Sequence, residues 1–172
     1  MKVFKFGGGI LYSAEAVKKI PAIIGMFPGE PLIIVVSAFG KTTNAIEKLI
    51  TSRFNGERQT REISGKIIDY HQEILQGLFP DPGHPVYAEI QVLWDELYEI
   101  ILREPPASYS EFYDKIICYG ELLSSKIVSH ALISAGLENN WIDVRRILKT
   151  DSAFQEASVD WEASQANAGR EI

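Results

Sequence analysis

The first 40 residues contain two strand-like apolar runs with a helix-like segment between them. Residues 3–6 and 32–37 are short, rich in β-branched and aromatic side chains, and bounded by glycine or proline, which predicts two strands. The second run is apolar almost throughout, as is typical of a strand buried on both faces. Between them, Ser13 is a suitable N-cap for a helix, and Pro21 predicts a kink or a restart near Ile20. This strand–helix–strand unit predicts a parallel sheet with a right-handed crossover.

The next part of the chain is predominantly helical in its spacing. Apolar residues recur every three or four positions, and turn residues separate the segments. We predict helices over residues 44–54, 61–79, 86–103 and 109–135, the last interrupted near Gly120 and ended by Gly136 as a C′ glycine. Residues 44–135 therefore form a helical excursion from the sheet. Residues 140–144 predict a third strand, and from Ser158 onward small and polar residues show no clear pattern.

Size and charge restrict the class of protein. A length of 172 residues allows one substantial core, so we expect one domain or part of a larger one. The net charge of −6 offers no basic surface for nucleic acid. The apolar runs at residues 22–27 and 32–36 fall far short of the ~20 residues that cross a membrane, which excludes membrane insertion. The amino terminus lacks the apolar region of a secretory signal, which predicts a cytoplasmic protein.

Cysteine and histidine provide no pattern for metal or disulfide chemistry. Cys118 is the only cysteine, so neither an intrachain disulfide nor a thiolate zinc site can form within the chain. His71, His84 and His130 are scattered without the mutual spacing of metal ligands. We therefore expect no protein-bound metal.

The first motif with chemical content is Lys5-Phe6-Gly7-Gly8-Gly9, a lysine near the end of a strand followed by three glycines. Glycines let backbone N–H groups approach phosphate oxygens closely, and the lysine adds a mobile positive charge. The motif suits a polyphosphate, although a tight strand-to-helix turn with a solvated lysine explains it equally well. Tyr12 occupies the last glycine position of the dinucleotide fingerprint, which disfavours NAD binding.

A second motif follows the second strand, at residues 35–44. It is not a P-loop, because Val35 stands where the Walker pattern requires glycine. Ser37, Thr42 and Thr43 form a hydroxyl-rich turn that can donate to a carboxylate or phosphate, or merely cap the next helix. Because the carboxyl ends of parallel strands meet at one edge, this turn and the glycine loop are expected to share one crevice.

A third motif places Glu121 directly after a glycine at an expected helix start, where it could serve only to balance the helix dipole. Together the motifs resemble those of aspartate kinases, members of the amino acid kinase family. Four segments occur in the order and approximate spacing of that family: Lys5-Phe6-Gly7-Gly8, Val36-Ser37-Ala38-Phe39-Gly40-Lys41-Thr42-Thr43-Asn44, Tyr119-Gly120-Glu121-Leu122-Leu123-Ser124 and Trp141-Ile142-Asp143-Val144-Arg145.

The resemblance implies an α/β fold, a three-layer α/β/α sandwich of the carbamate kinase-like type with a mainly parallel sheet. It also implies transfer of the γ-phosphoryl group of ATP, bound with Mg²⁺, to the β-carboxylate of L-aspartate. The product is 4-phospho-L-aspartate, and the step is the first of lysine, threonine and methionine biosynthesis. The β-carboxylate is already ionised at neutral pH and is itself the nucleophile, so no general base is required.

The resemblance also implies roles for individual residues. Lys5 would bridge substrate and phosphates as the catalytic cation, with Gly7, Gly8 and Gly9 in the phosphate-binding loop. Substrate aspartate would contact Ser37 and Thr43. The carboxylate of Glu121 would hold the substrate amino group, which completes the expected set of site residues.

Two departures from the family pattern limit the expected activity. Gly9-Ile10-Leu11 replaces a hydroxyl-bearing stretch, and residues 1–172 end before the family's Gly-Arg-Gly-Gly-Ser-Asp motif, its ATP-binding half and its ACT domains. We therefore expect the amino-terminal part of a kinase domain, incomplete in its sheet and nearly inactive alone. An exposed sheet edge would favour self-association into a homo-oligomer. The alternative is a degenerate, non-catalytic module that binds a small anion or dimerises.

Overall fold

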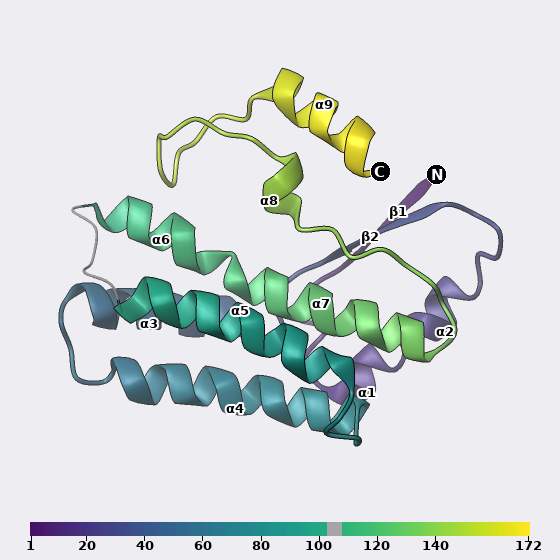
Figure 1. Cartoon of the computed structure of the whole chain (residues 1–172), viewed down its shortest axis with the longest axis horizontal. Coiled ribbons are helices and arrows are strands. Elements are labelled where there is room, and N and C mark those ends of the chain that lie inside the picture. The colour runs from purple at the N-terminus through teal and green to yellow at the C-terminus, as the bar shows by residue number, and fades with distance from the viewer. Residues whose placement is uncertain (103–107) are drawn as a thin grey trace.

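A computed structural model describes residues 1–102 and 108–172 of the chain (Figure 1). Strands β1 (Lys2–Phe6) and β2 (Leu32–Val36) pair in parallel, from Lys2 opposite Leu32 to Phe6 opposite Val36. Two short helices, α1 (Ala14–Val17) and α2 (Ile20–Ile24), connect them. The predicted strand–helix–strand unit is therefore confirmed.

The helical connection between the strands is interrupted near Ile20, as the sequence predicted. Ser13 caps α1 by accepting a hydrogen bond from the Ala16 amide at 3.3 Å. Helix α2 then starts anew with Pro21 in its first turn, where a missing N–H costs nothing.

The sheet is buried on one face only. Phe6 and Val36 point into the core with 8% and 9% of their surface exposed, whereas Val3 and Val35 on the opposite face are 61% and 45% exposed. The prediction that the second strand is buried on both faces is wrong for the described chain, because no described layer covers this side of the two strands. Self-association through the exposed sheet edge stays a prediction.

Helices α3–α7 form the bulk of the molecule, and the predicted helical segments are confirmed within a few residues. The prediction for residue 103 lies outside the described residues, and the interruption predicted near Gly120 lies at Cys118. Gly136 follows the C-cap of α7 with φ +79°, as expected of a C′ glycine. The bounds of the five helices are α3 Thr42–Phe54, α4 Thr60–Leu78, α5 Pro85–Leu102, α6 Tyr109–Ile117 and α7 Tyr119–Ser134.

Helix α7 runs through the centre of the core, with Leu123 and Ile127 fully buried. Among the described residues, the stretch Tyr109–Ser134 alone is long and apolar enough to cross a membrane by length and composition. It lies outside the apolar runs at residues 22–27 and 32–36. In the fold 61% of its most apolar window is buried, as in the core helix of a soluble protein. Its apolar character is therefore explained by packing against β2, α3 and α5.

The carboxyl-terminal region differs from its prediction. Residues 140–144 form no strand; instead α8 (Val144–Ile147) begins here, with Asp143 as its N-cap. Trp141, one of the residues that suggested a strand, packs against α7 instead, since its indole N–H donates to Ser125 Oγ at 3.0 Å, whereas Val144 is exposed. The region without a clear pattern forms α9 (Trp161–Glu171), which packs against α8.

Candidate functional site

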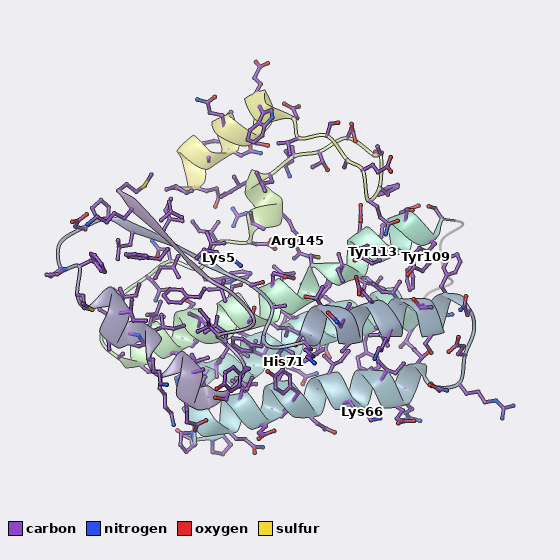
Figure 2. All side chains as sticks on the ribbon, turned by 180° about the vertical axis from the view of Figure 1, so that it is seen from behind. Lys5, Lys66, His71, Tyr109, Tyr113 and Arg145 are labelled. Atoms are coloured by element: carbon purple, nitrogen blue, oxygen red, sulfur yellow. The ribbon has the colours of Figure 1, made fainter. Side chains whose placement is uncertain are left out.

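The loop after β1 folds tightly at its glycines. The Ile10 and Leu11 amides both donate to the Gly7 carbonyl, at 2.9 and 3.1 Å. Lys5 extends from the end of β1 (Figure 2), and its Nζ lies 3.2 Å from the position that a Cβ on Gly7 would occupy. Within residues 1–102 and 108–172, no carboxylate pairs with the Lys5 ammonium group. The loop therefore presents a free positive charge beside main-chain amides.

The loop after β2 lies directly against this glycine loop. A Cβ on Gly8 would lie 2.4 Å from the Ala38 carbonyl oxygen and 3.1 Å from that of Gly40. The Gly40 amide donates to the Leu11 carbonyl at 2.8 Å, and its φ of +52° suits glycine. Parallel strand ends thus bring the two loops together, as the motif spacing predicted.

The first turn of α7 closes the junction from a third direction. Glu121 Oε1 accepts a hydrogen bond from the Ala38 amide at 3.3 Å, and the Ser124 hydroxyl donates to the Ser37 carbonyl at 2.9 Å. A Cβ on Gly120 would lie 2.9 Å from the Ala38 Cβ, so only glycine allows this approach. Glu121, which lies 83 residues from Ala38 along the chain, is therefore a neighbour of the second loop, against which the glycine loop packs.

The hydroxyl groups of the second loop do not cap the following helix. Lys41 occupies the N-cap position of α3 and makes no side-chain cap hydrogen bond. Thr42 is 3% exposed and its Oγ1 has no partner among the described residues, whereas Thr43 is half-buried in the first turn. The Thr42 amide donates to the Phe39 carbonyl at 2.9 Å, and the N-cap residue of α3 gives its first turn no side-chain hydrogen bond. A helix start without a side-chain cap can attract an anion.

The charges at this junction are of both signs. Lys5 and Lys41 are exposed and form no ion pair within the described parts of the chain. Glu121 contributes one carboxylate that is only partly buried. Two ammonium groups, uncapped helix amides and one carboxylate suit a ligand that carries both an amino group and anionic groups.

Three residues at the junction received no role from the sequence. Gly120 and Ser124 both contact the second loop, and their spacing of four on an α-helix was the signal that could have shown a shared face. Tyr70 of α4 donates its hydroxyl to the Tyr12 carbonyl at 2.9 Å and covers Gly40. No local pattern distinguishes Tyr70 from an ordinary helix-face residue.

Comparison with known proteins places the chain in a family. Residues 1–169 match the model of the Amino acid kinase family. The chain belongs to this family. The amino acid kinase relatives include aspartokinase 1 of Arabidopsis thaliana, which is 30% identical over 84% of this chain and 26% of its own length. An aspartokinase of Chlamydia pneumoniae is 26% identical over 96% of the chain and 34% of its own length.

Solved amino acid kinase structures share the fold. Escherichia coli aspartokinase III in complex with aspartate and ADP superposes with a TM-score of 0.82 at 24% identity, over 99% of this chain and 37% of that chain. Clostridium acetobutylicum aspartate kinase gives 0.76 at 21% identity, over 100% and 36%. The helix-rich chain with its small parallel sheet is thus an incomplete α/β fold, as predicted, and it spans about a third of these structures.

Proposed function

We propose that this chain carries the acidic-substrate and phosphate-handling half of an aspartate kinase site. The observation that carries the proposal is the meeting of the Lys5 loop, the Ser37 loop and Glu121 at one junction. The named relatives, all aspartokinases, agree with this chemistry. A cytoplasmic location is part of the same proposal.

In this proposal the two loops and the first turn of α7 each bind a different part of the substrates. The Glu121 carboxylate holds the ammonium group of L-aspartate, because this acidic side chain hydrogen-bonds to the second loop. Ser37 and Thr43 position the carboxylates of the substrate. Lys5 and the amides around Gly7, Gly8 and Gly9 hold the phosphates of ATP. The groups that bind the substrate and those that bind phosphate then lie on adjoining loops.

Phosphoryl transfer at such a site depends on positioning and charge. An oxygen of the substrate β-carboxylate forms a bond to the γ-phosphorus while the bond from that phosphorus to the β,γ-bridging oxygen breaks, and ADP leaves with the electron pair. Cations and amide dipoles reduce the repulsion between the substrate carboxylate and the phosphates of ATP. They also stabilise the charge on the transferred phosphoryl group in the transition state. Within the described residues no group of three or more histidine, cysteine or acidic side chains could hold a metal, so Mg²⁺ is proposed to arrive with ATP as substrate.

Glu121→Gln is expected to weaken aspartate binding about tenfold, because the charge that pairs with the substrate ammonium is lost. Isothermal titration of the purified chain with L-aspartate measures the change. Glu111→Gln is the matched control, since Glu111 also lies in a first helical turn but pairs with Lys115 on the surface. Equal affinities for all three proteins would contradict the proposed site.

Lys5→Ala is expected to weaken binding of inorganic triphosphate about tenfold at low salt, since one unpaired cation of the loop is removed. Lys2→Ala is the control on the same strand, because Lys2 is already paired with Glu30 at 2.8 Å. Unchanged triphosphate affinity in Lys5→Ala would remove Lys5 from the site. Binding of anions without selectivity for aspartate would instead support the non-catalytic anion-binding module.

A further inference from the structure

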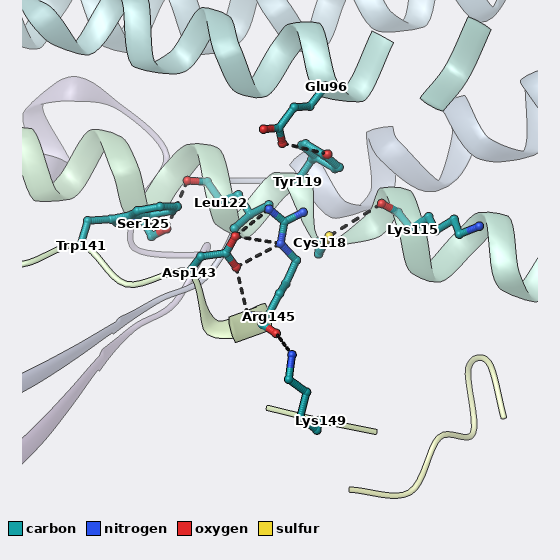
Figure 3. A network of polar contacts seen from close by, with 10 residues as sticks. All are labelled: Glu96, Lys115, Cys118, Tyr119, Leu122, Ser125, Trp141, Asp143, Arg145 and Lys149. Carbon is teal, nitrogen blue, oxygen red and sulfur yellow. Dashed lines mark hydrogen bonds and ion pairs between the residues drawn. The ribbon is translucent and has the colours of Figure 1, made fainter. Parts of the chain in front are cut away.

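The fourth family-like segment, residues 141–145, has no role in the site described above. In the structure Asp143 caps α8 and forms a fork with Arg145 (Figure 3). Arg145 Nε donates to Asp143 Oδ1 and Oδ2 at 3.0 and 2.9 Å, and a second guanidinium nitrogen donates to Oδ2 at 2.6 Å. This two-pronged geometry fixes the guanidinium plane as well as its position.

The segment holds α7 at several points. The Arg145 guanidinium lies over the Tyr119 ring, 5.5 Å from its centroid, and Tyr119 is the buried first residue of α7. On the other side the Tyr119 hydroxyl donates to Glu96 of α5 at 3.3 Å. At the far end of the segment, the Lys126 ammonium lies 3.6 Å from the centroid of the Trp141 ring.

Helical geometry places the contacts of this segment with Tyr119 and Lys126 on the side of α7 away from the candidate site. At about 100° per residue, Gly120, Glu121 and Ser124 share one face of α7. These are the residues that contact the Ser37 loop. Tyr119 and Lys126, seven residues apart, share the opposite face and meet the 141–145 segment. The first two turns of α7 are therefore held between the Ser37 loop and this segment.

We propose that Arg145, fixed by Asp143, is a positioning residue that packs against Tyr119 and thereby holds Glu121 against the Ala38 amide. The proposal rests on the proposed function in assigning this contact to substrate binding. Arg145 itself touches none of the loops of the site in any described contact.

The strength of the fork supports this role. Burial alone would raise the pKa of Asp143, but the hydrogen bonds and charge of Arg145 outweigh it and hold the pKa of this carboxyl below its usual range. The pair therefore stays ionised at neutral pH. A lysine at position 145 would keep the charge but lose both the fork and the flat face that lies on Tyr119.

The test uses the Ala38 amide proton of the ¹⁵N-labelled chain as a reporter. Glu121→Gln changes the acceptor of this amide, so it shifts the resonance in the wild-type background. In an Arg145→Ala background the same substitution is expected to shift it by less than about half as much, because Glu121 no longer sits against the amide. Arg146→Ala is the matched control, since Arg146 is the next residue but pairs with Glu171 on the surface.

Aspartate affinity gives a second, independent readout. Arg145→Ala is expected to weaken aspartate binding about fivefold, with Arg145→Lys failing to restore it and Arg146→Ala unchanged. Equal Ala38 shifts in the Arg145→Ala and Arg146→Ala backgrounds would overturn the proposal. A reduced shift without aspartate binding by any protein would overturn the proposed function alone. If Arg145→Ala does not fold, Asp143→Asn weakens the fork and is judged by the same shift.

Discussion

Gly8→Ala is expected to lower the free energy of unfolding by about 3 kcal/mol, the upper part of the range for forcing an extra methyl group into a close-packed contact. The new Cβ would lie 2.4 Å from the Ala38 carbonyl oxygen. The carbonyl oxygen is a backbone atom and a methyl group has no rotamer that moves it away, so the two loops must separate. Ala38 also donates to Glu121, so this separation is expected to disturb the proposed site.

The adjacent glycine provides the control for this prediction. A Cβ on Gly9 would meet nothing within 4 Å, and its φ lies outside the left-handed range. Gly9→Ala is therefore expected to change stability by less than about 0.5 kcal/mol. Urea unfolding of the three proteins measures the difference. Similar midpoints for Gly8→Ala and Gly9→Ala would show that the two loops do not need their close contact.

Acidification is expected to destabilise the protein through His71. This side chain of α4 is fully buried against Phe39 and Trp94, with ring centroids 6.0 and 5.6 Å away. Its Nδ1 pairs with the Ile67 carbonyl at 2.8 Å, and its Nε2 has no partner among the described residues. Burial lowers the pKa of His71 from 6.5 to about 4, because a proton on Nε2 would place an uncompensated charge in the core.

The direction of the pH effect follows from the two pKa values. Above pH 6.5 both folded and unfolded chains carry neutral His71, so it adds no pH dependence there. Between pH 6.5 and about 4 the unfolded chain binds a proton that the folded chain does not, so stability falls as the pH falls. The free energy of unfolding falls by about 3 kcal/mol in total over this range, and the decrease levels off below pH 4.

Urea unfolding at a series of pH values between 4 and 7 tests this prediction. His71→Leu and His71→Gln are both expected to make the free energy of unfolding less dependent on pH than in the wild type in this window. The side chain remains polar in His71→Gln. Because Phe39 lies in the loop after β2, acid is also expected to loosen that loop. A wild-type slope that persists in both variants would assign the pH dependence to other groups.

The sequence by itself determined the elements that depend on neighbouring residues. The helices of the central region, the restart at Pro21, the Ser13 cap and the Gly136 stop were all predictable, because spacing, caps and backbone freedom act within a few residues. The glycine and hydroxyl motifs could be connected because parallel strand ends meet at one edge. Resemblance to a family, rather than spacing, suggested the role of Glu121.

Only the tertiary structure decided which distant groups meet. Residues 140–144 have the composition of a strand, but no described strand pairs with them, and Trp141 and Arg145 bind the face of α7 instead. The open face at Val35 and the contact between Glu121 and Ala38 likewise depend on elements far apart in the chain. Local propensity cannot encode such pairings, because a side chain suited to a sheet is equally suited to a helix surface, and long-range packing selects between them.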